Sequence, residues 1–550
     1  MVFHPGANAL PPWSVGPTAT TGEPPALGDL LAAPAVKWPE RAAIDDGTDS
    51  YTFARLERAA TAVAALLAAR GVGPGDRVVV LTEKRSATAA LAVAVWKCGA
   101  VYVPLDAAEP EARLRGLLTR LAPKLVVSLG EREPLVPGLA TLGGAELAGP
   151  LAGPEATHAT VAHRPEDIAY IVFASSPTGE PQGAEIAVES LYAHFRGHNE
   201  VLRITADSRV LSLTPFHFDV SLLDTLLPLS VGAFVHQFRS LPAGAVMRSV
   251  LAKQQITHLI AVTMLLTMIT GDGRQITPAK LPALRLVMTG AQVCDADLLR
   301  IWTRQLPQTR LVQAFGPPEA TIFGFSYEAE PSAVETLTGA GPVGRPLGEV
   351  RARLVRGGVE VREAVGEGEL WVGGPQVMRG YFDQPEETAR VVVEADGVRW
   401  FRTGDICRRA ADGTLTLVRH ADERITWLAG RRTHLNELGR AAAACAGVDR
   451  AVTAVVRTAG RERIALVVAA KERRVLGEVA ERLRVELPEY LRPGLLAWTP
   501  TDPAPADPAG AGAELIARLG AAAAESDSPC FALSADGTVE PIDEVELCLQ

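Results

Sequence analysis

The chain has 550 residues, a formal net charge of −10 and 47% hydrophobic residues. This length exceeds one ordinary core, so we expect a large domain and at least one smaller one. The acidic balance excludes the basic face that nucleic-acid binding requires, and no apolar run approaches the roughly 18–20 residues of a membrane span. Six scattered cysteines without a C-x-x-C pair exclude a zinc or disulfide framework. Without a signal-peptide pattern, we expect a cytoplasmic protein that binds neither nucleic acid nor membrane.

Helix and strand patterns alternate from residue 26 onward. An amphipathic helix is predicted over 51–72 and a second helix over 86–100; strands are predicted over 76–82, 101–106, 123–129, 208–214, 256–262 and 284–290. Short β-branched strands that alternate with helices are typical of parallel sheets with crossover connections. The sequence therefore predicts an α/β fold, with a large N-terminal domain of stacked, mostly parallel sheets.

The pattern changes near residue 350 to the two-residue alternation of antiparallel strands. Stretches such as "GELWVGG" and "VRWFRTGDI" predict a barrel-like subdomain over about 350–421. Helix, strand, strand and helix patterns after residue 422 predict a small, mobile α+β domain. We expect a flexible leader at 1–25, a large core at 26–421, a small C-terminal domain at 422–520 and a polar tail at 521–550.

Four stretches carry more specific information, and they follow one another in a fixed order. They are "FASSPTGEPQG" at 173–183, "PFHFDVSLLD" at 215–224, "QAFGPPEATI" at 313–322 and "FRTGDICRRAADGTL" at 401–415. A strand that ends in a small, hydroxyl-rich turn predicts a phosphate cradle built from backbone N–H groups and hydroxyls. An ordinary surface loop is the alternative for the first stretch taken alone.

In this order and spacing, the chain resembles the adenylate-forming superfamily of acyl-CoA synthetases, luciferases and nonribosomal-peptide adenylation domains, most closely the last. The resemblance covers roughly residues 26–500. The family's phosphate loop, its Tyr-Gly-Pro-Thr-Glu segment and its Tyr-x-Thr-Gly-Asp segment are matched at Ser175, Thr178, Gly179, Pro181, Gly183, Phe315, Gly316, Pro317, Glu319, Phe401, Thr403, Gly404 and Asp405.

The resemblance implies ATP or AMP and Mg²⁺ as ligands. Phe315 would stack on adenine, Asp405 would bind the ribose hydroxyls, and Glu319 with Thr178 would hold the metal ion. From the residues alone, Phe315 could equally be core, Asp405 a turn cap and Glu319 a solvated acid. The full nucleotide-binding set is Ser175, Ser176, Thr178, Gly179, Phe315, Gly316, Glu319, Asp405, Arg419 and His420. The catalytic set is Thr178, Gln182, His217 and Glu319, and the hinge residue is Asp422.

Asp219 is the clue to the acyl substrate. A carboxylate among apolar neighbours needs a cationic partner, and the resemblance pairs this one with the α-ammonium of an amino acid. The alternative is a surface aspartate near a helix N-terminus. The implied pocket lining is apolar and favours an aliphatic or small aromatic side chain: Val220, Leu223, Ile260, Val287, Thr289, Ala314, Ile322 and Phe323. His217, in contrast, resembles the acyl-CoA synthetase branch.

Several departures from the family affect phosphate handling. Pro177 removes a backbone donor from the phosphate loop, Gln182 replaces its lysine, and Pro318 replaces a phosphate-facing threonine. His420 stands where the family has a ribose-contacting arginine, with Arg419 beside it as a candidate substitute. The chain has seven lysines and none after Lys471, so the family's charge-stabilising C-terminal lysine, a role worth ~10²–10³ in rate, is missing.

These features leave three hypotheses open. In the first, the chain is an amino-acid adenylating enzyme. Its acyl group would pass to a carrier thiol on a separate protein, because no carrier-attachment serine follows in the sequence. Alternatively, it is an impaired homologue that binds AMP or an adenylate as a partner subunit. Finally, it is an atypical ligase on the same scaffold. In place of the C-terminal lysine, "PADPAGAGAELIARL" at 505–519 offers only Arg518.

Overall fold

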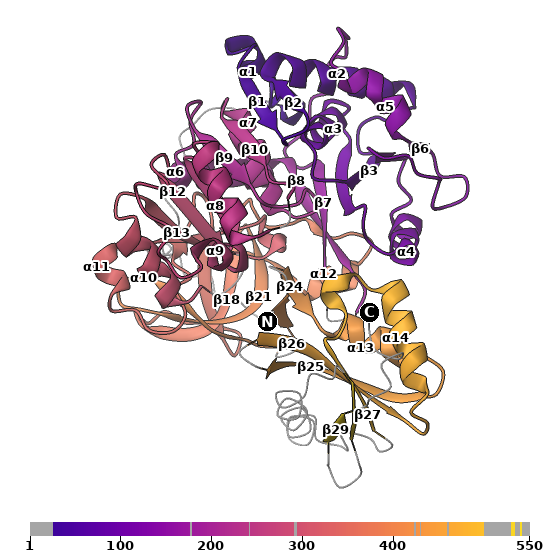
Figure 1. The fold of residues 1–550 in the computed structure, drawn as a ribbon, viewed down its shortest axis with the longest axis vertical. Helices are drawn as coiled ribbons and strands as arrows, with labels where there is room; N and C mark the ends of the chain where they lie inside the picture. Colours follow the sequence, from indigo (N-terminus) through magenta and orange to yellow (C-terminus); the bar gives the residue numbers. More distant parts are fainter. Residues whose placement is uncertain are drawn as a thin grey trace. The chain divides into compact units, whose positions relative to one another are not determined.

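The structure is a computed structural model. It describes two strands near the C-terminus and residues 26–499; within this range it leaves out 177–178, 241, 291–293, 423–424, 429–430 and 459–460. Its contacts divide the chain into two compact units (Figure 1). The large unit comprises 1–107, 122–173 and 183–421, and the small unit comprises 108–121, 174–182 and 422–550. Two segments that precede residue 421 therefore group with the C-terminal part. The predicted leader 1–25 and most of the predicted tail lie outside the described residues.

A seven-stranded sheet in the large unit has the order β19-β8-β7-β4-β3-β5-β6. Its strands are β3 (Arg77–Thr82), β4 (Val101–Asp106), β5 (Leu125–Ser128), β6 (Thr141–Leu142), β7 (Ile168–Ala174), β8 (Gln182–Ala187) and β19 (Gly380–Tyr381). The pairs from β7 across to β6 are parallel, and β19 pairs antiparallel with β8. The valine-rich strand β3 is buried from its second residue to its last, as expected for a parallel sheet covered on both faces.

A nine-stranded sheet has the order β15-β14-β13-β12-β11-β9-β10-β1-β2. It consists of β1 (Ala42–Asp45), β2 (Ser50–Thr52), β9 (Arg209–Ser212), β10 (Phe234–Gln237), β11 (His258–Val262), β12 (Leu286–Gly290), β13 (Arg310–Phe315), β14 (Phe325–Glu328) and β15 (Arg345–Pro346). The run from β1 to β13 is parallel, whereas β2, β14 and β15 are antiparallel additions at its edges. The carboxyl ends of β9 and β13 lead into the candidate site.

The helices of the large unit are α1 (Ala32–Lys37), α2 (Phe53–Ala69), α3 (Ser86–Lys97), α5 (Gly144–Leu151), α6 (Val188–Leu202), α7 (Leu227–Ser230), α8 (Gly244–Lys253), α9 (Thr263–Thr270), α10 (Ala296–Gln305), α11 (Pro331–Val334) and α12 (Pro385–Val391), with shorter turns η2 (Leu27–Asp29), η3 (Leu222–Leu226) and η4 (Pro318–Ala320). Helix α2 begins where the Thr52 side chain accepts from the backbone N–H of Arg55. Helix α3 is buried on nearly every side, which its run of apolar residues from Ala89 to Trp96 allows.

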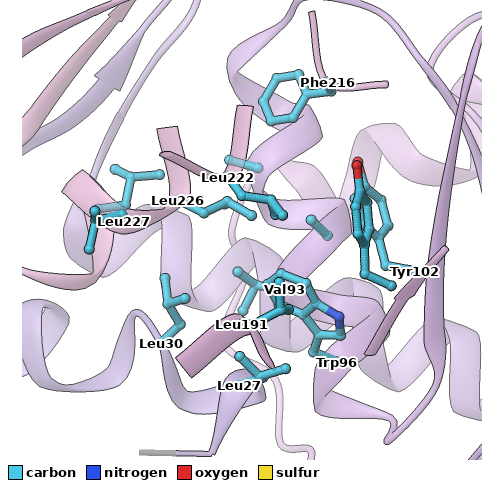
Figure 2. Packing of buried hydrophobic residues seen from close by; sticks show 14 of the residues in the cluster. Leu27, Leu30, Val93, Trp96, Tyr102, Leu191, Phe216, Leu222, Leu226 and Leu227 are labelled. Carbon is cyan, nitrogen blue, oxygen red and sulfur yellow. The ribbon is translucent and has the colours of Figure 1, made fainter. Parts of the chain in front are cut away.

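The main hydrophobic cluster joins α3, α6 and the η3 turn. Figure 2 shows Val93 and Trp96 of α3 near Leu191 of α6, with Leu222 above them. The indole N–H of Trp96 donates to the carbonyl of Ala169 at 2.8 Å, so its polar atom is satisfied inside the core. The η3 turn, which follows β9 and Asp219 in the chain, is anchored in this cluster through Leu222 and Leu226.

The antiparallel subdomain expected over 350–421 is present as a six-stranded sheet. Its path is β17-β16-β18-β21-β20, with β22 paired to β21. The strands are β16 (Arg351–Arg356), β17 (Val359–Glu360), β18 (Gly366–Gly373), β20 (Val392–Ala395), β21 (Val398–Arg409) and β22 (Leu415–His420). Every pairing in it is antiparallel, which confirms the predicted α/β fold with an antiparallel part.

The small unit contains the helices α4 (Glu111–Leu121), α13 (Asn436–Ala443) and α14 (Val475–Glu486) and the turn η5 (Glu489–Leu491). Its strands are β23 (Ile425–Leu428), β24 (Arg431–His434), β25 (Val448–Thr458), β26 (Arg461–Ala470), β27 (Leu495–Thr499), β28 (Cys530–Leu533) and β29 (Val539–Pro541). The predicted helix, strand, strand and helix are present as α13, β25, β26 and α14. The sequence pattern missed the hairpin of β23 and β24 and the three added strands β27–β29.

Among the described residues, no helix is both long and apolar enough to cross a membrane. This agrees with the absence of a long apolar run in the sequence.

Candidate functional site

Glu319 lies in η4, directly after β13, and is almost completely buried. The hydroxyl of Tyr381 donates to its Oε1 at 2.8 Å, whereas its Oε2 is buried without a hydrogen-bond partner among the described residues. Thr321 and Ile322 follow with positive φ angles of 56° and 71°. Such angles are rare for non-glycine residues and costly for a β-branched one. The Thr321 hydroxyl, which donates to the carbonyl of Gln376 at 2.6 Å, helps to hold this strained turn in place.

Asp219 lies in a partly buried turn between β9 and η3. Its Oδ1 accepts from the backbone N–H of Val220 at 2.8 Å. Burial raises the pKa of this carboxyl to about 7; the Val220 hydrogen bond opposes the shift and the negative charge of Glu319 adds to it. Among the described residues, no cation contributes to the electrostatics of Asp219. The turn thus holds a carboxylate that a cationic ligand would stabilise.

His217 is held at the carboxyl ends of two strands of the seven-stranded sheet. Its Nδ1 lies 3.3 Å from the hydroxyl of Thr82 in β3, and its Nε2 lies 3.5 Å from Oδ2 of Asp106 in β4. The imidazole is largely buried, and both ring nitrogens contact polar groups. The sequence analysis selected His217 but missed Thr82 and Asp106. Their proximity to His217 depends on β3 and β4 being neighbours in the sheet, which the sequence does not show.

The predicted ribose site lies on β21 and β22. Asp405 is nearly buried, and its backbone N–H donates to the Thr403 hydroxyl at 2.9 Å. His420 is directly opposite Asp405 in the sheet, and its Nε2 lies 3.2 Å from the Thr403 carbonyl oxygen. A Cβ on Gly404 would lie 2.6 Å from His420 Nε2, and the φ of +71° at this position also favours glycine.

Arg419 is placed differently from His420. It pairs with Ile406 in the sheet, and successive side chains of a strand point to opposite faces. Within the described part of the chain, its Nη1 lies 3.5 Å from the carbonyl oxygen of His420. The β22 register therefore puts His420 on the face of Asp405, and the substitution of Arg419 for a ribose-contacting arginine stays a prediction.

Phe315 and Gly316 end β13 beside the Glu319 turn. The Phe315 ring is partly buried and meets the buried ring of Phe325 edge-on, with centroids 6.3 Å apart. A Cβ on Gly316 would lie 2.7 Å from backbone atoms of Ile322 and Gly324. Glycine at 316 thus allows the strained turn to fold back against β13, next to the aromatic face predicted to meet adenine.

The predicted substrate-lining residues are all buried, but they do not lie on one surface. Six belong to the main hydrophobic cluster, namely Val220, Leu223, Ile260, Ala314, Ile322 and Phe323. Val287 instead packs in a second cluster with Leu259 and Leu311. Thr289 shares its face of β12, where its hydroxyl lies 3.3 Å from that of Thr263. Alternation along β12 directs Leu286 and Met288 toward the main cluster and Val287 and Thr289 to the other face, and the lining role of these residues stays a prediction.

The phosphate-loop residues group with the small unit. Ser175 Oγ accepts from the backbone N–H of His434 at 2.8 Å, and the Ser176 hydroxyl donates to the Glu180 carbonyl at 2.6 Å. Gly179 has a φ of +77°, and a Cβ there would lie 3.1 Å from the Asn436 carbonyl oxygen. Gln182 is the buried first residue of β8. Pro177 and Thr178 lie outside the described residues.

The predicted hinge residue Asp422 contacts a buried histidine that the sequence analysis did not select. Its Oδ2 lies 3.0 Å from His434 Nε2, and His434 Nδ1 accepts from the Asn436 N–H. These contacts fix the neutral tautomer with the proton on Nε2. Arg518 lies outside the described residues, and within them no cluster of three histidine, cysteine or acidic side chains could hold a metal ion.

Tyr381 is a further site residue that the sequence analysis missed. It lies within "GELWVGGPQVMRGYFDQPEET", of which the sequence analysis used only the first seven residues, as a predicted strand. Its hydrogen bond to Glu319 spans 62 positions of the chain. The position carried no signal in the sequence, because an aromatic residue in an edge strand is ordinary core packing.

Two curated proteins are similar in sequence to this chain over most of its length. Phenyloxazoline synthase MbtB of Mycobacterium sp. is 30% identical over 495 residues, covering 88% of this chain and 41% of that protein. Tyrocidine synthase 3 of Brevibacillus parabrevis is 28% identical over 484 residues, covering 85% of this chain and 7% of that protein. The chain therefore spans less than half the length of either relative.

Solved structures show the same fold. The crystal structure of IdnL1 has a TM-score of 0.74 and 26% identity, covering 88% of this chain and 100% of that one. Holo-PA1221, an NRPS protein containing adenylation and PCP domains, has a TM-score of 0.76 and 21% identity, covering 89% and 84%. Residues 31–382 match the AMP-binding enzyme family, which spans more than half of the sequence. The chain belongs to the AMP-binding enzyme family, with the fold of the adenylate-forming enzymes.

Proposed function

We propose that the chain activates a small apolar amino acid, or a related carboxylic acid, as its acyl adenylate at the expense of ATP. The observation that carries this proposal is Asp219, a partly buried carboxylate with a raised pKa and no cationic influence among the described residues. An α-ammonium group would supply the missing charge. The adjoining residues Val220 and Leu223 are apolar, which favours an aliphatic or small aromatic side chain.

The large unit supplies the groups that would hold the nucleotide. Asp405 would accept hydrogen bonds from the ribose hydroxyls, and the exposed part of Phe315 would face adenine. Mg²⁺ fits Glu319, because its Oε2 is a buried carboxylate oxygen with no other partner in the described part of the chain. When bound, the ion would neutralise charge on the phosphates. Tyr381 fixes the carboxylate that receives it.

The acceptor of the activated acyl group would be a carrier thiol on a separate protein. Holo-PA1221 is described as an NRPS protein that contains adenylation and PCP domains, which supports a carrier as partner. His217, held by Thr82 and Asp106, is the described imidazole nearest in sequence to Asp219 and would orient the substrate carboxylate.

A second candidate function is an AMP-binding partner subunit that does not turn over ATP. The specific observation in its favour is the phosphate loop, where Gln182 is a buried strand residue in place of a lysine. This candidate predicts that AMP raises the melting temperature of a chain that forms no adenylate.

Amino-acid-dependent exchange of pyrophosphate into ATP tests the proposed function. We expect exchange with one or a few aliphatic or small aromatic amino acids, at least tenfold above a reaction without amino acid. Charged amino acids should give none, because no charged side chain lies among the six predicted lining residues of the main cluster. If no proteinogenic or common nonproteinogenic acid supports exchange while AMP still stabilises the chain, the second candidate is correct.

A further inference from the structure

A cavity of about 400 Å³ lies in the large unit and shares no lining residue with the candidate site. Its walls come from the first turn of α6, the segment before β16, the segment between β18 and β19, and the hairpin of β20 and β21. A volume of this size is typical of sites for small molecules. Six lining residues are charged, namely Glu189, Glu349, Arg351, Arg379, Glu394 and Arg399.

The three glutamates of this lining are already paired with arginines. Each pair is joined by a hydrogen bond from a guanidinium nitrogen to a carboxylate oxygen. The pairs are Arg379 with Glu189 at 2.7 Å, Arg399 with Glu394 at 3.0 Å and Arg196 with Glu349 at 2.7 Å. A carboxylate whose charge is balanced in this way repels an incoming anion less than a bare one does. The acidic residues therefore do not close the cavity to anions.

Two guanidinium groups of the lining keep donors to spare. Arg351, the first residue of β16, is partly buried, and its side chain makes no hydrogen bond or ion pair with any other residue that the structure describes. Arg379 uses Nη2 for Glu189, but its Nε is buried and has no partner in the same part of the chain. A buried N–H group without an acceptor is costly. These donors favour a ligand that brings acceptor oxygens and a negative charge.

The wall that carries Arg379 is held in place by hydrogen bonds to neighbouring elements. The backbone N–H of Arg379 donates to the carbonyl of Glu185 in β8 at 2.8 Å, and the Ser190 hydroxyl donates to the carbonyl of Pro375 at 2.6 Å. Gly374 has a φ of +118°, and a Cβ there would lie 2.8 Å from a backbone oxygen of the facing wall. A wall fixed in this way presents Arg379 with little further loss of conformational entropy, which favours binding.

We propose that this cavity binds a phosphate group, either free phosphate or the monoester of a small molecule, through Arg351 and Arg379. A tetrahedral phosphate has acceptor oxygens in several directions and can bind guanidinium groups on different walls, whereas a carboxylate accepts within one plane. The N–H groups that have no acceptor in the described part of the protein would then be satisfied. The lining contains none of the predicted nucleotide-binding residues, so this inference does not depend on the proposed function.

Equilibrium binding of inorganic phosphate to the full chain, measured by calorimetry at constant ionic strength, tests this inference. In Arg351→Gln we expect the Kd for phosphate to rise about tenfold, because one charge-assisted hydrogen bond is lost. Glu394→Gln should tighten binding about two- to fivefold, because it removes a negative charge from the lining and releases Arg399. Phosphate that binds elsewhere on the chain would respond to neither substitution.

The matched control is Arg356→Gln. Arg356 is the last residue of the same strand, but it is exposed and does not line the cavity. Loss of its charge should therefore leave the Kd for phosphate unchanged, which separates binding in the cavity from a general effect of net charge.

Glycerol phosphate and malonate identify the class of ligand. Glycerol phosphate that binds at least as tightly as inorganic phosphate would indicate a monoester, and weaker binding would indicate free phosphate. The inference is overturned if the original chain binds no phosphate, if Arg351→Gln leaves the Kd within about twofold, or if Arg356→Gln weakens binding as much. Weaker binding in Glu394→Gln, or malonate that binds more tightly than phosphate and depends on Arg351, would overturn it as well.

Discussion

Asp219→Asn should reduce amino-acid-dependent pyrophosphate exchange at least 100-fold and, at the same time, make the protein more stable above neutral pH. Exchange falls because the substrate ammonium would lose its charged partner in a largely desolvated turn. The reduction should appear mainly as a higher KM for the amino acid. AMP binding, which involves Asp405 and Phe315 in this account, should be unchanged.

The stability effect follows from the raised pKa of Asp219, about 7 instead of the usual 3.8. The protonated carboxyl is the form that the fold prefers, so its contribution is fully present below pH 3.8 and is lost as the pH rises through about 7. Asparagine cannot ionise. The free energy of unfolding of Asp219→Asn should therefore match that of the original chain near pH 4. At pH 8 it should be higher by about 1–3 kcal/mol, after allowing for partial exposure, and the melting temperature should be higher accordingly.

Melting curves between pH 4 and pH 8, with exchange assays on the same samples, provide the measurement. Asp297→Asn is the matched control, since Asp297 is 78% exposed on α10; it should alter neither exchange nor the pH profile. In the original chain, the KM for the amino acid should fall from pH 6 to pH 8 as Asp219 ionises. The other titratable groups that interact electrostatically with Asp219 are Tyr170 and Glu319. Exchange by Asp219→Asn within threefold of the original would contradict the role assigned to this residue.

Glu319→Gln should reduce exchange by about 10²–10³-fold and raise the Mg²⁺ concentration needed for half-maximal rate. Glutamine keeps the oxygen that accepts from Tyr381, so the turn should remain folded while the charge offered to the metal ion is lost. Tyr381→Phe should be milder, about tenfold in rate and 1–2 kcal/mol in stability, because it leaves a buried carboxylate oxygen without its donor.

A Mg²⁺ titration of the exchange rate, with a melting curve for each variant, separates the two effects. Glu319→Gln should melt close to the original chain and show a shifted Mg²⁺ dependence; Tyr381→Phe should melt lower with an almost unshifted one. If Glu319→Gln retains the original Mg²⁺ dependence, Glu319 does not hold the ion.

The order of helices and strands could be predicted because each element has its own hydrophobic pattern in the sequence. Strand β3 contains the buried apolar run Val78 to Leu81, and α2 carries a helical apolar face, so each pattern fits a single element. The hairpin of β23 and β24 could not be predicted in this way. Its sequence, "ITWLAGRRTH", mixes apolar and basic residues without a two-residue alternation.

The sequence could predict which residues belong to the site, but not which residues each of them contacts in the folded chain. Motif order selected Asp219, Glu319 and Asp405, but register and strand direction decide what each one meets. The opposed faces of Val287 and Ile260, and of Arg419 and His420, follow from sheet pairing that no local pattern encodes. Likewise, the contact between Arg379 and Glu189 spans 190 positions of the chain and depends on tertiary packing.

The structure of the chain crystallised with ATP, Mg²⁺ and the amino acid that gives the strongest exchange tests the central claim most directly. We predict continuous density for an aminoacyl adenylate, with its ammonium group at Asp219 and its ribose hydroxyls at Asp405. Density for AMP or intact ATP alone at Asp405, with no amino acid at Asp219, would contradict the claim that this chain forms the adenylate.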